Sequence, residues 1–260
     1  MKIFLTGSTG LVGKHLLRRL RQKHEIIECS RQKGLDILDK EKLLRAMQGC
    51  DIVIHTAAET NENARDVRKI NVEGTRNLLE AGKKAAIKQF VHISTMGVYG
   101  SITTLIREDS PQKPINAYEK SKKAAEEAVR EYQSFFPITI FRPTLIVGAN
   151  AYWKKIFEMV RKGYPILGNG KNSWQLTYVE DLVSAIEYSL GNPRTYNEDF
   201  LVVSDEEYSF GDVINAVAHL QGVKRPISVP LWIGEWGSHP LSWYARVTGT
   251  KALLTPYSVK

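Results

Sequence analysis

The sequence has only two cysteines among its 260 residues, Cys29 and Cys50, which is too few for a disulfide framework or a cysteine-based metal cluster. No apolar stretch approaches the roughly 20 residues that cross a membrane as a helix. The N-terminus also lacks the charged, apolar and small-residue segments of a secretory signal. The six histidines have no spacing typical of a metal site. We therefore expect a cytoplasmic protein with buried, reduced thiols, no metal and no membrane partner.

A concentrated block of positive charge is also missing, although the formal net charge is +8. Binding to nucleic acid is driven by clustered lysines and arginines. The densest basic run here, from Lys14 to Lys23, is interleaved with leucines, as the polar face of a helix covering a sheet would be. We therefore expect no nucleic-acid partner. With 43% hydrophobic residues, the chain can bury a substantial core and suits one domain with a small additional lobe.

Short apolar segments alternate with helix-like segments along the first 140 residues. Strands are expected at 2–6, 25–29, 51–55, 90–94 and 138–141, and helices around 11–22, 40–48, 64–86 and 117–134. This order predicts an α/β fold with a Rossmann-type doubly wound parallel sheet, right-handed crossovers and helices on both faces. Ligands of such sheets bind beyond the C-terminal ends of the strands.

A glycine-rich segment, Thr6–Gly13, directly follows the apolar run Ile3–Leu5 and opens the first predicted helix. This is the strand, turn and helix context that the pyrophosphate of a dinucleotide needs. Gly7 would permit the tight turn, Gly10 would let backbone N–H groups approach phosphate, and Gly13 would let the helix pack closely on the strand. The segment predicts a cofactor-binding turn that includes Gly7, Thr9, Gly10, Leu11 and Val12.

Tyr118 and Lys122 are four residues apart and therefore lie on one face of a helix. A phenol with a pKa of roughly 10 is a poor acid–base catalyst near neutral pH, but a nearby ammonium group would stabilise the phenolate and lower that pKa. The spacing alone also fits an ordinary amphipathic helix in which the tyrosine packs and the lysine is solvated.

Together with these two motifs, further segments between Met1 and about Leu190 resemble the extended short-chain dehydrogenase/reductase family, which includes NAD-dependent epimerases and dehydratases. The segments are Leu35–Ile37, His55–Ala58, Asn71–Leu79, His92–Gly100, Arg142–Pro143 and Tyr178–Asp181. The resemblance implies a nicotinamide cofactor, a homodimer, and a Thr95, Tyr118 and Lys122 catalytic triad. It also implies that Asp36 and Ile37 bind the adenine, with further cofactor contacts from Thr56, Ala57, Ala58, Asn71, Tyr118, Lys122 and Pro143.

Two neighbouring residues, Ser94 and Thr95, could supply the hydroxyl group of the triad. Both lie at the end of the predicted strand 90–94. Because side chains alternate along a strand, only one of them can point into the cleft. Aligned on Val98–Gly100, the catalytic hydroxyl of the family corresponds to Thr95, which would orient the substrate oxygen, and Ser94 would support it. The same resemblance divides the chain into an NAD(P)-binding Rossmann domain at 1–145, completed by about 176–203, and a substrate-binding lobe at 146–175 and 204–260.

The end of the second predicted strand decides between the two nicotinamide cofactors. A carboxylate there would bind the ribose hydroxyls of NAD, whereas this chain has Ser30 and Arg31, with Lys33 close by. A hydroxyl and a guanidinium suit the extra phosphate of NADP. We therefore expect NADP, while NAD stays possible if a shifted register brings Glu28 to this place.

Three positions depart from the sugar-nucleotide enzymes of the family. The 4,6-dehydratases carry an Asp–Glu pair after the catalytic hydroxyl, where this chain has Met96–Gly97, so dehydration is not expected. Leu145 stands near the place of an asparagine that contacts the sugar nucleotide, and Trp174 near that of an arginine that binds its diphosphate. These departures favour an apolar, uncharged small-molecule substrate.

Three patterns resemble the branch of 3β-hydroxysteroid dehydrogenases and dihydroflavonol reductases, namely Arg142–Thr144, Leu167–Gly170 and Lys251–Thr255. The sequence therefore predicts an oxidoreductase that transfers a hydride between NADP and a secondary alcohol or ketone. One alternative is a sugar-nucleotide epimerase with tightly bound NAD, and another is a non-catalytic dinucleotide-binding protein.

Overall fold

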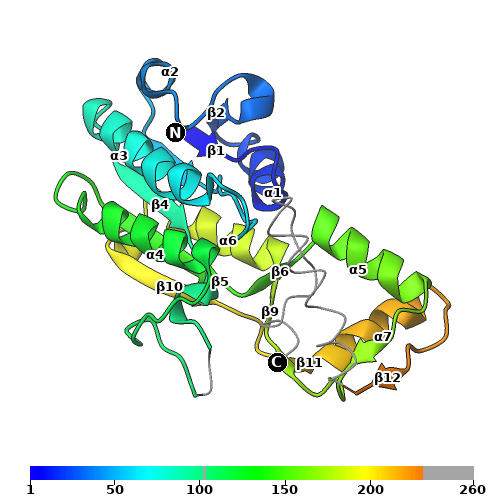
Figure 1. Ribbon diagram of the computed structural model, residues 1–260. Helices are drawn as coiled ribbons and strands as arrows, with labels where there is room; N and C mark the ends of the chain where they lie inside the picture. Colours follow the sequence, from blue (N-terminus) through cyan, green and yellow to red (C-terminus); the bar gives the residue numbers. More distant parts are fainter. Residues whose placement is uncertain (102–103, 231–260) are drawn as a thin grey trace. The chain divides into compact units, whose positions relative to one another are not determined.

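A six-stranded parallel sheet organises the first of two structural units in the computed structural model, which describes residues 1–101 and 104–230 (Figure 1). This unit comprises Met1–Thr144 and Thr177–Val202, and the second comprises Leu145–Leu176 and the chain from Val203 onward. Residues 231–260 of the expected substrate lobe, including Lys251–Thr255, lie outside the described residues.

The sheet confirms the predicted Rossmann-type fold. Its spatial order is β10 (Glu198–Val202), β5 (Ile138–Pro143), β4 (Gln89–Ile93), β3 (Ile52–His55), β1 (Lys2–Thr6) and β2 (Glu25–Cys29). All neighbouring pairs are parallel. Every residue of β3, β4 and β5 is buried, as expected for strands covered on both faces. The strand order reverses beside β1, which places a ligand crevice at the C-terminal ends of β1 and β3.

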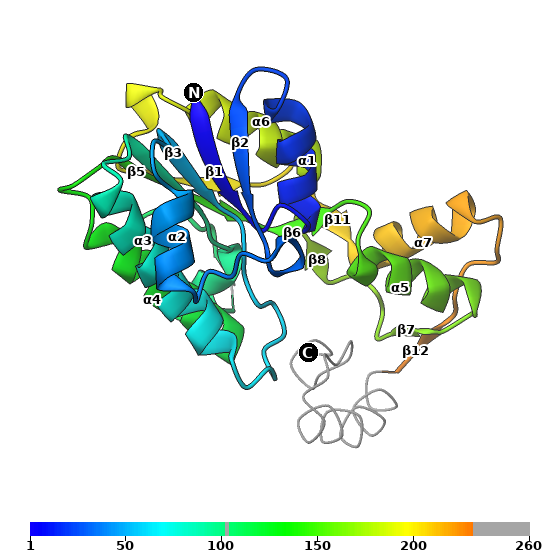
Figure 2. The ribbon, with the colours of Figure 1, turned by 90° about the horizontal axis from the view of Figure 1, so that it is seen from above.

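Helices cover both faces of this sheet. α1 (Leu11–Leu20) and α6 (Val179–Ser189) lie on one face, and α2 (Lys40–Ala46), α3 (Gly74–Lys84) and α4 (Ala117–Arg130) on the other (Figure 2). The basic face of α1 is paired with α6, since Glu180 receives contacts of 2.6–2.7 Å from His15, Arg18 and Arg19. The densest cationic run of the sequence therefore joins two helices of one layer.

The helix expected over 64–86 differs from the observed one. A π-helical turn, η2 (Lys69–Glu73), precedes α3 and buries Asn71. At Gly74, which begins α3, a Cβ atom would come within 2.5 Å of the Ile37 side chain. The 3₁₀ turns η1 (Arg31–Lys33), η3 (Met96–Tyr99) and η4 (Pro193–Thr195) complete this unit.

The second unit has its own apolar core between α5 (Ala151–Arg161) and α7 (Phe210–Leu220). Two short strand pairs flank the helices, β8 (Ser173–Trp174) with β11 (Tyr208–Ser209), and β7 (Ile166–Leu167) with β12 (Ser228–Val229). The chain enters this unit at β6 (Leu145–Val147) and leaves it at β9 (Leu176–Tyr178). In the part of the chain that the structure describes, no helix is long and apolar enough to cross a bilayer.

Candidate active site

The glycine-rich turn has the geometry that its sequence predicts. Gly7 has a φ of +69°, and a Cβ atom there would lie 2.7 Å from Ala57 N. The turn is closed by the Gly10 N–H, which donates to Gly7 O at 2.8 Å. A Cβ atom at Gly13 would lie 2.1 Å from Gly7 O, so α1 can begin this close to β1 only because Gly13 has no side chain.

Beside this turn lies a cavity of about 640 Å³ in the first unit, within the range of small-molecule sites. Ten of the residues expected to bind the cofactor line it, namely Gly7, Thr9, Gly10, Ser30, Arg31, Asp36, Ile37, Thr56, Ala57 and Ala58. Further lining residues were not predicted from the sequence, namely Cys29, Gln32, Leu35, Leu38, Asp66, Lys69 and Ile70. Leu35 belongs to a segment that carries the family resemblance, and the others lie outside those segments.

The end of β2 presents Ser30 and Arg31 to this cavity. Ser30 is buried, and its hydroxyl has no hydrogen-bond partner among the described residues. Arg31 is exposed at the start of η1. Glu28 pairs with Leu5 in the sheet and lies 3.5 Å from Arg21, and it does not line the cavity. The register of β2 is therefore the one that brings Ser30 and Arg31, and not Glu28, to the cavity.

Five other residues expected to contact the cofactor do not line this cavity. Leu11 and Val12 form the first turn of α1, and Pro143 is the buried last residue of β5. Tyr118 and Lys122 lie on α4.

Asn71, also expected at the cofactor, instead links three segments of the protein. Its Nδ2 donates to Glu59 O at 2.9 Å and to Ser121 Oγ at 2.8 Å, while its Oδ1 accepts from Glu59 N–H at 2.8 Å. Every hydrogen-bonding atom of the amide is therefore used within the protein. Asn71 fixes α4 against η2 and does not line the cavity.

The expected triad is built from the end of β4 and the first turns of α4. Asn116 caps α4 in a capping box with Glu119, which fixes Tyr118 in the first turn. Thr95 Oγ1 accepts from Gly97 N–H at 3.2 Å, and the Thr95 side chain also hydrogen-bonds Tyr118. Lys122, one turn further on, is buried, and its ammonium donates to Ile93 O at 2.7 Å.

The pKa values of Tyr118 and Lys122 differ from the expectation. Burial, with a smaller effect of Glu119, raises the pKa of Tyr118 to about 12. Burial lowers the pKa of Lys122 to about 8, against the attraction of Glu126. The predicted lowering of the phenol pKa by Lys122 is wrong for these residues by themselves, because the effect of burial outweighs the lowering by the Thr95 hydrogen bond. The Lys122 ammonium instead donates to the Ile93 carbonyl.

Two buried histidines surround the Lys122 ammonium. His92 Nε2 lies 3.4 Å from Lys122 Nζ, and the His55 ring lies 5.3 Å from the His92 ring. Burial, together with the Lys122 charge, lowers the pKa of His55 to about 3 and that of His92 well below its usual value. Both imidazoles are therefore neutral at physiological pH, and His55 is held by Thr6 and Thr75 at 2.8 and 2.9 Å. They form part of the protein interior that encloses the lysine.

A buried ion-pair network behind α4 was not found from the sequence. Arg142 is 1% exposed and binds Glu126 through Nε and Nη2, with distances of 2.7–3.3 Å. The same guanidinium reaches Asp199 at 2.7 Å and the Tyr99 hydroxyl at 2.6 Å. Burial alone would raise the pKa of Glu126, but Arg142 holds it below the usual value. The network joins α4, β5, β10 and η3 and so fixes the two segments that carry the triad.

The family whose sequence model matches this chain is the NAD dependent epimerase/dehydratase family, and the match covers residues 3–202. The chain belongs to this family. It is therefore an enzyme that uses a nicotinamide dinucleotide, and the extended short-chain dehydrogenase/reductase resemblance is confirmed.

Among its relatives is the N-acetyl-alpha-D-glucosaminyl-diphospho-ditrans,octacis-undecaprenol 4-epimerase of Escherichia coli O157:H7. It is 29% identical over 280 residues, which cover 99% of this chain and 84% of the relative. The UDP-glucose 4-epimerase of Vibrio cholerae is 27% identical, over 88% of this chain and 79% of its own. The crystal structure of UDP-glucuronic acid 4-epimerase from Bacillus cereus in complex with NAD has the same fold, with a TM-score of 0.78 and 24% identity over 88% of this chain and 87% of its own.

These relatives change the expected substrate class. The comparisons support the epimerase alternative better than the expected reductase of an apolar ketone or alcohol. The two residues that suggested an apolar substrate have packing roles: Trp174 lies 4.7 Å from Phe210 between ring centroids, and Leu145 packs against the same core of the second unit. Their apolar character therefore follows from the core that they fill.

Proposed function

We propose that the protein is a 4-epimerase of a sugar whose anomeric oxygen carries a diphosphate group. The observation that carries this proposal is the placement of Thr95 after the end of β4 and of Tyr118 and Lys122 in the first turns of α4, with no carboxylate at Met96–Gly97. Similarity to the two 4-epimerases supports the reaction class.

The dinucleotide site fits the proposed cofactor. The Gly7 turn leaves no room for a Cβ atom, and the Ser30 hydroxyl, which has no partner in the part of the chain that the structure describes, is available to a ligand. Backbone N–H groups at the start of α1 suit a pyrophosphate. A bound nicotinamide would supply the acceptor for a hydride in the oxidative half of the reaction and the donor in the reductive half.

The residues of the chain would supply the proton transfers. Tyr118 would take the proton of the sugar 4-hydroxyl during oxidation and return it after the ketone has presented its other face. The Thr95 hydroxyl would orient the same sugar oxygen. The Lys122 ammonium would hold the ribose of the cofactor and favour the phenolate form of Tyr118 once its charge faces the site.

Dehydration is less well supported, although 4,6-dehydratases are among the relatives. Eliminating water from the sugar needs an acid and a base beyond the triad. Glu119, whose side chain lies against Gly97, is already bound by the backbone N–H groups of Ile115 and Asn116. It completes the capping box of Asn116 at the start of α4 and is not a free catalytic acid.

The residues that follow β2 favour NADP as the cofactor. Ser30 and the exposed Arg31 line the cavity where a ribose 2′-phosphate would lie, and Glu28 points elsewhere. Arg is well shaped for a phosphate. The Bacillus cereus enzyme was solved with NAD, so titration of both cofactors against the purified protein decides the choice.

The reaction is tested by incubating the protein and either cofactor with a sugar diphosphate ester and recording proton NMR couplings at C4. We expect interconversion of the two C4 epimers with no net reduction of the cofactor. Formation of a 4-keto-6-deoxy sugar would establish a dehydratase instead. Net accumulation of reduced nicotinamide would establish a dehydrogenase.

A further inference from the structure

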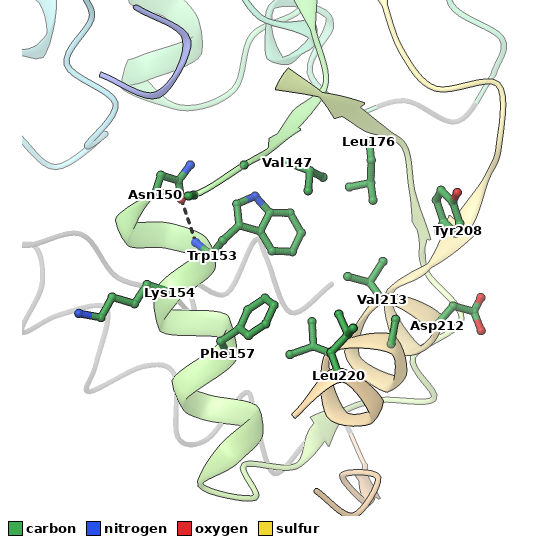
Figure 3. Close-up of a pocket in the computed structure, with 14 residues that line it drawn as sticks. Val147, Asn150, Trp153, Lys154, Phe157, Leu176, Tyr208, Asp212, Val213 and Leu220 are labelled. Carbon is green, nitrogen blue, oxygen red and sulfur yellow. Dashed lines mark hydrogen bonds between the residues drawn. The ribbon is translucent and has the colours of Figure 1, made fainter. Parts of the chain in front are cut away.

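A second cavity, of about 710 Å³, lies entirely within the second unit and is far more apolar than the dinucleotide site. One face of α5 and one face of α7 line it (Figure 3). The lining positions are spaced i, i+3, i+4 and i+7 on each helix, which places them on a single face. They are Asn150, Trp153, Lys154 and Phe157 on α5, and Val213, Ala216, Val217 and Leu220 on α7.

Trp153 and Phe157 turn toward Val213 and Leu220 across this cavity in Figure 3. Leu220 is 75% exposed, although it is a large apolar side chain at the end of a well-formed helix. Leaving such surface in contact with water forgoes roughly 25 cal/mol for each Å² that a ligand could cover. The cavity therefore favours an apolar ligand.

The polar side chains of the lining are poorly suited to a nucleoside. Asn150 Oδ1 caps α5 at Trp153 N–H, and Asp212 accepts from the backbone and hydroxyl of Ser209. Tyr208 donates to Glu206. A nucleobase needs free donors and acceptors, because its own polar groups would otherwise be buried without partners.

Lys154 is the cation in this lining, and among residues 1–101 and 104–230 it has no ion-pair partner. Its side chain points away from the apolar cluster in Figure 3. An apolar cavity with one free ammonium at its edge matches a ligand that is apolar along its length and anionic at one end.

We propose that this cavity binds the isoprenoid chain of a polyprenyl diphosphate sugar, the lipid-linked form of the substrate class assigned above. The inference rests on the proposed function, which it narrows to a lipid carrier in place of a nucleoside. At about 30 Å³ per heavy atom, the share of a water molecule in the liquid, the cavity holds roughly 20 atoms, or about four isoprene units. The relative that acts on an undecaprenol-linked sugar aligns with 99% of this chain.

Trp174 and Leu145 agree with this ligand. Both fill the core of the second unit, where the sugar-nucleotide enzymes were expected to carry an arginine and an asparagine. Without that arginine, the diphosphate of either kind of ligand lacks its expected partner, and unpaired phosphate charges are costly to desolvate. The rest of the ligand then has to supply more of the affinity. An isoprenoid held by the α5 and α7 faces supplies affinity that does not depend on the diphosphate.

The experiment is calorimetry on the full-length protein with geranylgeranyl diphosphate below its micelle concentration, compared with inorganic pyrophosphate and free UDP. We expect micromolar binding of the prenyl compound and affinities weaker than about millimolar for the other two, a difference of about 1,000-fold. Equal affinity for pyrophosphate would assign binding to the phosphates alone and overturn the proposal. Micromolar binding of UDP would assign the site to a nucleoside and overturn it as well.

Two variants test whether the ligand binds in this cavity. Ala216 is an exposed lining residue of α7, so Ala216→Trp should fill the space without disturbing the core and weaken prenyl binding by about tenfold or more. His219→Trp adds an indole to an exposed position of the same helix that does not line the cavity, and it should bind as the native protein does. Leu220→Asp is a second variant that should weaken prenyl binding, and it does so without a larger side chain. Unchanged affinity in both Ala216→Trp and Leu220→Asp would overturn the assignment.

The result of this binding experiment can be distinguished from the result of the test of the proposed reaction. If the protein epimerises a nucleotide sugar but does not bind geranylgeranyl diphosphate, the lipid proposal fails and the 4-epimerase stands. If it binds the prenyl compound in this cavity but epimerises neither a nucleotide sugar nor a prenyl diphosphate sugar, the reaction assignment fails.

Discussion

At the scale of single residues, the chemistry depends on how α4 presents Tyr118 and Lys122. The two residues were found from the sequence because their spacing has a chemical reason. Their pKa values could not be found in that way, because burial is the largest cause of both shifts, with smaller effects of Glu119 on Tyr118 and of Glu126 on Lys122. Spacing identifies which groups share a helix face, whereas their protonation is set mainly by the burial that the rest of the fold imposes.

Replacing the proton-transfer group tests the role of Tyr118. Tyr118→Phe removes only the hydroxyl, so folding and cofactor affinity should be retained while kcat falls by roughly 10²-fold or more, the scale of lost acid–base catalysis. Steady-state kinetics and cofactor titration of the purified variant check this. Undiminished turnover would show that another group transfers the proton.

Arg31→Ala tests whether the residues at the end of β2 bind the 2′-phosphate of NADP. The variant should lose about 1.5–3 kcal/mol of NADP binding, the range of a charge-assisted hydrogen bond, while the affinity for NAD changes little. Titration of each cofactor into the native and variant proteins measures both. Equal losses for the two cofactors, or tighter native binding of NAD, would place the 2′-phosphate elsewhere.

The buried histidines give the folded protein a defined acid sensitivity. The folded-state pKa of His92 lies well below the unfolded value of about 6.5, so the unfolded state binds more protons as the pH falls below that value. The contribution of His92 to stability is therefore complete above about pH 6.5 and is lost as the pH falls toward the folded pKa. In His92→Asn, the slope of unfolding free energy against pH between about 6 and 4 should decrease by up to about 1.4 kcal/mol per pH unit. Urea unfolding across this range measures it, and an unchanged slope would mean that His92 titrates normally.

At the scale of elements, helix signals in the sequence are reliable where a cap is local. Asn116 and Glu119 mark the start of α4, and the observed helix begins at Ala117 as predicted. The segment 64–86 shows the opposite case. Its periodicity predicts one helix, but the π-helical turn η2 is stabilised by bonds from Asn71 to Glu59 and Ser121, which no local pattern contains.

The cap of α4 should matter for catalysis as well as for stability. Asn116→Ala should cost about 0.5–2 kcal/mol of unfolding free energy and also lower kcat, because Tyr118 lies in the first turn. Asn116→Asp, another good cap, should restore both. Ser209→Ala removes the matching capping box of α7 and should cost similar stability while leaving kcat unchanged. Equal kinetic effects of the two alanine variants would mean that the α4 cap has no special part in placing Tyr118.

At the scale of the whole molecule, most of the parallel sheet could be predicted because five of its six strands are short apolar runs, whereas β10 was not predicted as a strand. The network of Arg142, Glu126 and Asp199 could not, because its members are 16 and 57 residues from Arg142 and meet only in the folded chain. The cavity between α5 and α7 is another such feature. The apolar faces of these helices would be expected equally if the two helices packed fully against each other, and only the fold shows that part of each face lines a cavity.

The most direct test of the proposed reaction follows a deuterium atom at C4 of the sugar. Native protein is incubated with N-acetylglucosamine linked through diphosphate to a short prenyl chain, and in parallel with UDP-N-acetylglucosamine, each deuterated at C4. We predict that one of them yields the C4 epimer with deuterium retained at C4, because a hydride that leaves and returns within one site does not exchange with water. A keto sugar with an equal amount of reduced nicotinamide, or an epimer whose label has been lost to solvent, would contradict the proposed 4-epimerase reaction.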